Sequence, residues 1–134
     1  MSNSIATGVA YNDPEFSTVY ATAEIGYATA AQGSVTQLTS KSTGVTLNTS
    51  SGRITMNNEA LAATTNVSFT LTNSTISAKD VIIFNVAGGN ATAGTYNVFT
   101  STLAAGSATV VLRNISAGSL SEAVVLNFAI IHAQ

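Results

Sequence analysis

From residue 33 onward, apolar and polar positions alternate along the chain with a period of two. Val67, Phe69 and Leu71 are separated from one another by a serine and a threonine, a spacing typical of a β-strand with one buried and one solvated face. Clusters of turn-forming residues separate such runs at short intervals. We expect strands near residues 34–40, 44–48, 53–57, 66–73, 80–87, 95–103, 108–114 and 123–132.

Two of the later runs are apolar at nearly every position, residues 81–86 and 124–131. Strands of this kind are covered on both faces. A small sandwich covers only one face of each strand, so the second face of the last strand needs another cover. That face carries Val125, Ala129 and Ile131, and we predict that it is an oligomer interface or lies under the N-terminal segment.

Short strands at roughly ten-residue spacing are typical of a sandwich or a barrel. We therefore expect an all-β fold, an antiparallel β-sandwich of about eight strands that is jelly-roll-like, although the pattern leaves other antiparallel topologies open. A chain of 134 residues fits one domain with a tail. We divide it into an extended N-terminal arm, residues 1–33, and a β-sandwich domain, residues 34–134.

The N-terminal arm has no strand-like alternation and holds the single proline of the chain. Aromatic side chains on an arm add no stability unless something buries them. The arm therefore packs on its own domain or, as we favour, on a neighbouring subunit. The residues that we expect to make this contact are Tyr11, Asp13, Pro14, Phe16 and Tyr20.

The chain carries four basic and six acidic residues, 7% of the total, whereas an ordinary soluble domain carries about 25%. The four basic residues are scattered, which disfavours a nucleic-acid partner. No apolar run is long enough to span a bilayer, and residues 1–10 lack the pattern of a signal peptide. We expect no membrane partner, synthesis in the cytoplasm, and an assembly rather than a free monomer, because a weakly charged surface gives little repulsion.

Candidate catalytic groups are few. His132 is the only histidine; as a general base it would need a nucleophile and an orienting acid, and we interpret it as a tail residue. The glycine-rich residues 88–94 lack the Gly-Lys-Ser/Thr ending of a phosphate-binding loop and are interpreted as a hairpin loop. We expect no enzymatic activity, no cofactor and no metal.

Several segments resemble a module of tailed-bacteriophage virion proteins. They are residues 33–37 (GSVTQ), 39–48 (TSKSTGVTLN), 52–57 (GRITMN), 67–73 (VSFTLTN) and 112–131 (LRNISAGSLSEAVVLNFAII). Similar modules occur in capsid decoration (cement) proteins and at the ends of phage fibres. Residues 8–14 (GVAYNDP) also look like the arm of small cement proteins.

The resemblance implies a structural protein of the virion, located on the outer capsid surface after synthesis in the host cytoplasm. Its partners would be the major capsid protein and further copies of itself, as a homotrimer. The alternative is a receptor-binding or polysaccharide-binding tip domain of a tail fibre. A cellular adhesin or surface-layer module also fits the threonine-rich composition, but it would need an export signal.

Overall fold

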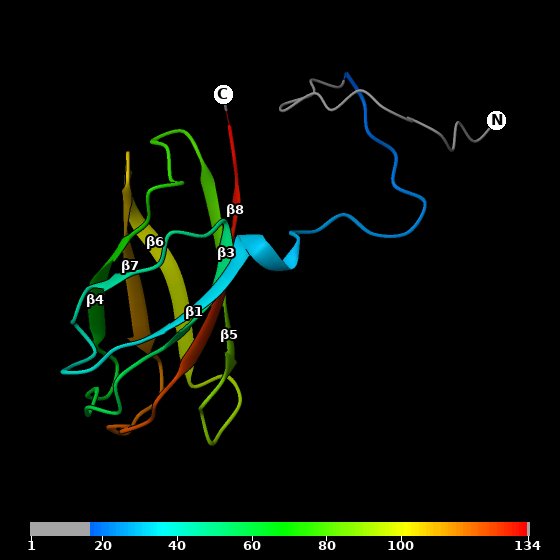
Figure 1. The fold of residues 1–134 in the computed structure, drawn as a ribbon. Helices are drawn as coiled ribbons and strands as arrows, with labels where there is room; N and C mark the ends of the chain where they lie inside the picture. Colours follow the sequence, from blue (N-terminus) through cyan, green and yellow to red (C-terminus); the bar gives the residue numbers. More distant parts are fainter. Residues whose placement is uncertain (1–16, 134) are drawn as a thin grey trace.

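The computed structural model describes residues 17–133 and shows two four-stranded β-sheets packed face to face (Figure 1). A single 3-10 turn, η1 (Thr29–Ala31), precedes the first strand. The strands are β1 (Gln32–Thr36), β2 (Val45–Thr46), β3 (Ser51–Thr55), β4 (Asn66–Thr72), β5 (Val81–Gly88), β6 (Tyr96–Ala104), β7 (Ser107–Asn114) and β8 (Val125–Ile131). The predicted all-β fold is confirmed, and every strand overlaps its predicted range. β1 begins at Gln32, inside the segment predicted as arm, and ends four residues before the predicted end, while β2 has only two residues.

The two sheets have the strand orders β1-β3-β8-β5, the first sheet, and β2-β4-β7-β6, the second sheet. In each sheet the first pair is parallel and the other two pairs are antiparallel. The expectation of a purely antiparallel sandwich is therefore wrong at the pairs β1/β3 and β2/β4. The first strands of the chain alternate between the sheets, so each parallel pair is joined by a crossover through the opposite sheet. This strand order does not confirm the jelly-roll likeness.

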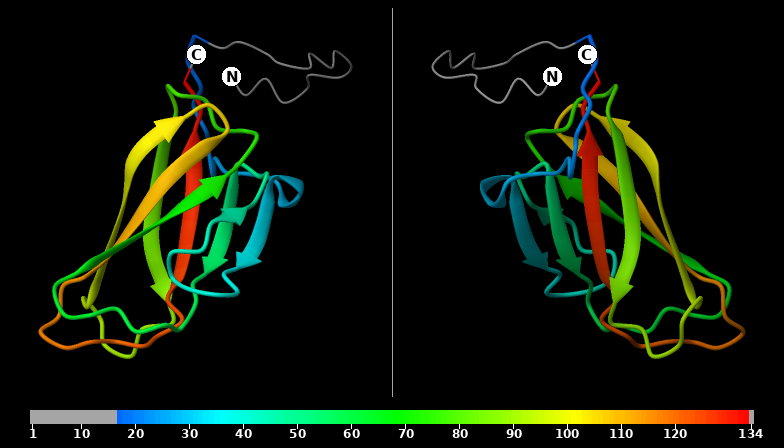
Figure 2. Two further views of the ribbon diagram at one scale, coloured as in Figure 1. Left: turned by 90° about the vertical axis from the view of Figure 1, so that its left-hand side faces the viewer. Right: turned by 90° about the vertical axis from the view of Figure 1, so that its right-hand side faces the viewer.

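The glycine-rich loop after β5 also differs from its prediction. We expected a hairpin there, but β5 belongs to the first sheet and β6 to the second. The loop therefore carries the chain across the edge of the sandwich, as Figure 2 shows from two sides. A tight turn that joins neighbouring strands of one sheet does occur between β6 and β7, where Gly106 has a φ of 79°.

The core lies between the sheets and is built from the inward positions of each strand. Phe69 and Leu71 on β4 are buried, while Ser68 and Thr70 between them are exposed, so the predicted alternation is confirmed there. The rings of Phe84 and Phe128 pack against each other with centroids 5.7 Å apart and a tilt of 38° between their planes. The side chains that are completely buried include Ile54, Leu71, Val110, Leu112, Val124, Leu126 and Ile130.

Candidate functional site

The outward face of the first sheet carries an apolar patch at one end. β5 pairs with β8 so that Val81 lies opposite Ile131 and Ile83 lies opposite Ala129. Val81, Ile83 and Ile131 are 55%, 54% and 55% exposed. Their neighbours along each strand point inward and complete the core, because side chains on a strand alternate between its faces. We call Val81, Ile83, Ala129 and Ile131 the outer patch.

The structure brings two of the three predicted interface residues together. Ala129 and Ile131 are in the outer patch, while Val125 lies half-buried at the opposite end of β8, where it pairs with Thr55 and Gly88. Val81 and Ile83 were not singled out from the sequence, although the run that holds them was recognised as apolar on both faces. Only the β5/β8 register shows that they extend the same surface.

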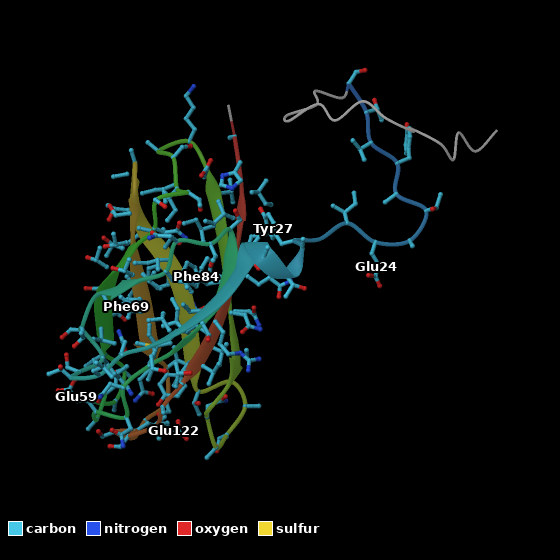
Figure 3. The ribbon with its side chains drawn as sticks, in the orientation of Figure 1. Glu24, Tyr27, Glu59, Phe69, Phe84 and Glu122 are labelled. Carbon is cyan, nitrogen blue, oxygen red and sulfur yellow. The ribbon has the colours of Figure 1, made fainter. Side chains whose placement is uncertain are left out.

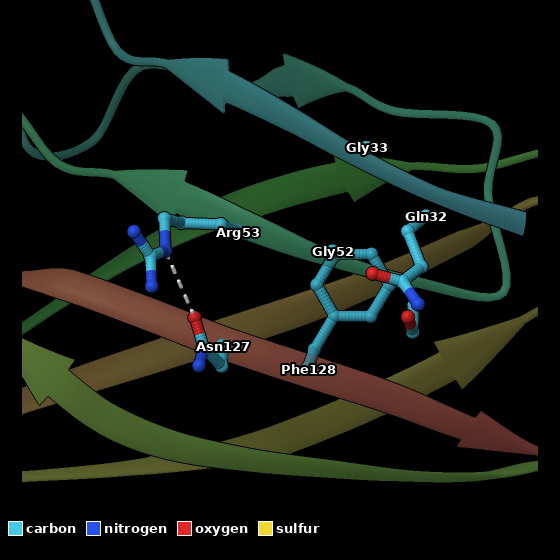
Figure 4. Close-up of a pocket in the computed structure, with 7 residues that line it drawn as sticks. Gln32, Gly33, Gly52, Arg53, Asn127 and Phe128 are labelled. Atoms are coloured by element: carbon cyan, nitrogen blue, oxygen red, sulfur yellow. Dashed lines mark hydrogen bonds between the residues drawn. The ribbon is translucent and has the colours of Figure 1, made fainter. Parts of the chain in front are cut away.

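The middle and the far side of the same sheet face are polar. Arg53 and Asn127 are paired across β3 and β8, and the Arg53 Nε–H donates to Asn127 Oδ1 over 3.3 Å. A groove of about 300 Å³ lies beside this pair (Figure 4). Gln32, Gly33, Ser51, Gly52, Arg53, Asn127 and Phe128 line it. The Phe128 ring packs beneath Gly52, whose missing side chain leaves space for it.

The segment predicted as the arm meets the sandwich beside the outer patch. The Tyr27 hydroxyl donates to the carbonyl of Ile130, and Gln32 Nε2 donates to the Tyr27 carbonyl over 2.8 Å. A cavity of about 430 Å³ lies between this part of the arm and the end of β8, lined by Ile25, Gly26, Tyr27, Ala129, Ile130, Ile131 and His132. Tyr27 therefore anchors the arm at the border of the outer patch.

Beyond this anchor the arm makes little contact with its own domain. Residues 17–26 are exposed throughout, and the segment runs away from the sandwich on the side of the first sheet (Figure 1). Of the predicted contact residues, Tyr20 is 91% exposed, whereas Tyr11, Asp13, Pro14 and Phe16 lie outside the described residues. Glu24, labelled in Figure 3, is the only charged residue between 17 and 40.

His132 has partners that the sequence did not reveal. Its Nδ1 lies 3.0 Å from Asp80 Oδ2, and its Nε2 lies 3.4 Å from Ser50 Oγ. A hydroxyl, an imidazole and a carboxylate thus lie in the order used by hydrolases, but 3.4 Å is long for a hydroxyl–imidazole hydrogen bond. The Asp80 carboxylate also accepts the backbone N–H groups of Ser77 and Ala133. The cluster therefore joins the end of β8 to the turn before β5, at one end of the outer patch.

These hydrogen bonds make Asp80 a stabilising group whose effect depends on pH. They hold its pKa well below the usual value, with the Ser77 N–H as the largest cause and the Ala133 N–H, the Ser77 hydroxyl and His132 adding to it. A carboxyl with a lowered pKa in the fold stabilises it above the unfolded pKa of about 3.9, and the effect is lost as pH falls below that value.

We expect Asp80→Asn to lower stability at pH 7 and to flatten the loss of stability between pH 5 and pH 2. Urea midpoints measured across that range test the prediction. If the stability of Asp80→Asn changed with pH in parallel with that of the unmodified chain, Asp80 would not be the carboxylate responsible for the pH dependence.

A second buried ionic group lies at the opposite end of the sandwich. Lys41 is 1% exposed, and its ammonium donates to the backbone carbonyls of Asn57 and Glu122. The backbone N–H of Lys41 donates to Glu59 Oε2 over 3.1 Å. Glu59 and Glu122 are labelled in Figure 3. Burial lowers the pKa of Lys41, and the charges of Glu59 and Glu122 partly offset the shift. Lys41 is thus a structural cation and not a surface charge for a partner.

Residues 17–133 contain no group of three or more histidine or acidic side chains placed to hold a metal ion. No helix in this part of the chain has the length and hydropathy to cross a membrane. Comparison of the chain with known protein families, curated proteins and solved structures finds no match.

Proposed function

We propose that the chain is a capsid decoration (cement) protein, a structural protein that binds the outer surface of a phage head and stabilises the shell by several noncovalent contacts. The observation that carries the proposal is the combination of an uncharged, half-exposed patch on the first sheet with an arm that leaves the domain beside it. Both are surfaces that a partner can cover, and neither is needed to complete the core. The resemblance to phage virion modules supports the same class.

The arrangement suits a protein that contacts several subunits at once. Each copy offers an arm and a sheet face, so individually weak contacts add through their effective concentration. Contacts between neutral groups also weaken little as salt rises, unlike exposed ion pairs. The proposed partners are the major capsid protein and further copies of the chain, as a homotrimer near local threefold axes. The proposed role includes no catalysis and no cofactor.

Deletion of residues 2–20 should abolish binding to the head while the sandwich stays folded. We expect binding to emptied phage heads to weaken at least 100-fold, measured by co-sedimentation, because the deletion removes Tyr20 and the rest of the predicted contact residues. The β-type circular dichroism should be retained, since these residues precede η1. Phe99→Ala, an exposed aromatic on the second sheet, is the control and should bind normally. Unchanged binding of the deletion variant refutes the role of the arm.

The polar groove beside Arg53 favours a second candidate, a receptor-binding or polysaccharide-binding tip domain of a tail fibre. Its Arg, Asn, Gln and Ser side chains are the groups that hydrogen-bond sugar hydroxyls. Imaging of the intact particle separates the candidates, because a decoration protein covers the head and a tip domain lies at the tail. A glycan array provides an independent test: sugar binding that Arg53→Ala removes would support the tip domain.

A further inference from the structure

We propose that the outer patch of one copy binds the free part of the arm, residues 17–24, of a second copy of the same chain. The inference names the partner of a surface that the proposed function uses, and it rests on that function in expecting an oligomer on the head. It is carried by three observations: the composition of the patch, the position from which the arm leaves, and the charges that border each of them.

The outer patch is a continuous apolar area that is not covered within its own domain. Two directly opposed cross-strand pairs, Val81/Ile131 and Ile83/Ala129, form it, and opposed pairs on a sheet face make a continuous apolar area. β5 is also an edge strand, and an exposed apolar edge promotes association unless it is covered. The inward side chains of β5, including Ile82 and Phe84, already pack against the core. The half-exposed outward side chains are therefore the part that remains to be covered.

The arm leaves its own domain in a position to reach another copy. Tyr27 is held at the end of β8, and Ile25 and Gly26 line the cavity beside it. Residues 17–24 extend away from the sandwich (Figure 1), and eight extended residues span about 27 Å, enough to reach an adjacent copy. Val19 and Tyr20 are exposed along this segment, so it offers apolar side chains that match the chemistry of the patch.

The bordering charges agree with this pairing. Glu24 is the one charged residue among residues 17–24. The exposed Lys79 lies two residues before Val81, in the turn that leads into β5, and Asp80 between them is buried. The two charges are opposite and can pair when an arm crosses the patch. Because every copy carries both an arm and a patch, the contact is heterologous, and such contacts close into a ring when the rotation between copies allows it. A ring of this kind is compatible with the proposed homotrimer.

Disulfide trapping between separately prepared chains tests the inference, and the absence of cysteine from the sequence makes the test clean. One chain carries Tyr20→Cys and the other carries Ile83→Cys; the two are mixed without phage heads and oxidised. We expect a cross-linked pair of chains on a non-reducing gel. Val19→Cys and Ala21→Cys, each mixed with Ile83→Cys, allow for the register of the arm, because a disulfide needs Cα atoms less than about 7 Å apart.

Two controls define the outcomes. Tyr20→Cys mixed with Ser101→Cys, an exposed position on the second sheet, should give no more cross-linking than chance collision. A chain carrying both Tyr20→Cys and Ile83→Cys tests folding back onto its own patch, since it would then form a disulfide within one chain. That outcome, or cross-linking of all arm positions at the control level, overturns the inference.

A non-covalent measurement completes the test. Ile83→Asp places a charge in the patch, and we expect it to weaken self-association at least tenfold in sedimentation equilibrium. Unchanged association would count against the patch. Neither measurement uses phage heads, so the result is independent of the head-binding assay described above. Cross-linking between copies of a chain that does not bind heads supports the contact between arm and patch and rejects the decoration role. Head binding by a chain that does not cross-link supports the decoration role and rejects the contact.

Discussion

Replacing Gly89 by alanine should lower the free energy of unfolding by about 3 kcal/mol or more, one of the largest single-residue effects that we expect in this chain. Gly89 has a φ of 76°, and a Cβ built there would lie 2.1 Å from the carbonyl oxygen of Ala123. The obstacle is backbone, so no side-chain rotation can relieve the overlap. The loop would have to separate from the segment that leads into β8.

Gly94 provides a matched control in the same loop. Its φ is also 76°, but a Cβ at this position has no atom within 4 Å. Gly94→Ala should therefore cost only the strain of a left-handed L-residue, about 1–2 kcal/mol. Urea unfolding of both variants tests this prediction. If the free energy of unfolding falls with urea at the same slope in both, the difference between the variants gives the cost of the close approach to Ala123. Equal destabilisation of the two variants would show that the contact with Ala123 has no energetic weight.

The loop contact matters because it fixes the start of β8. The Ala91 N–H donates to Glu122 Oε1 over 2.6 Å, directly after the close approach at Gly89. Burial and the neighbouring Glu122 carboxylate raise the pKa of Tyr96, which follows the same loop. β8 carries Ala129 and Ile131 of the outer patch, so an error in its placement would also disturb the proposed interface.

The strands could be predicted from the sequence because their signal is local. The alternation around Phe69 predicts which face of the strand is buried, and this prediction does not depend on the position of the strand in the sheet. Strand pairing has no such local signal. β1 pairs in parallel with β3, and its side-chain alternation is compatible with either direction. The glycine-rich loop was misinterpreted for the same reason, since its composition fits a turn whether it joins one sheet or two.

The candidate site was predictable only in part. The doubly apolar run indicated that Ala129 and Ile131 need a cover, but the register with β5 was required to add Val81 and Ile83. His132 lies 52 residues from Asp80 along the chain, and no local pattern connects them. Lys41 lies between Ser40 and Ser42 in a polar stretch that favours a solvated surface loop. Its burial depends on carbonyls that only the tertiary fold brings together.

Lys41→Ala should lower the free energy of unfolding by about 3 kcal/mol or more. The variant leaves the carbonyls of Asn57 and Glu122 without their shared donor, and each buried group left unpaired costs about 1–3 kcal/mol. It also empties the volume of the lysine stem. Lys79→Ala is the matched control, because Lys79 is exposed and surface substitutions usually stay within about 0.5 kcal/mol. Similar urea midpoints for the two variants would contradict the structural role of Lys41.

A pH series distinguishes the buried cation from simple packing at this position. Since the pKa of Lys41 is lowered in the fold, the unfolded chain holds its proton more tightly between that pKa and the ordinary value of about 10.4. Lys41 therefore contributes an increase in stability as pH rises through this window. Tyr96 contributes in the opposite sense above about pH 10, because its raised pKa makes the unfolded chain lose a proton first. The free energy of unfolding is measured against pH for the unmodified chain and for Lys41→Met, which keeps most of the side-chain volume. The difference, unmodified chain minus variant, should rise with pH. A difference that does not change with pH would place the ammonium in solvent.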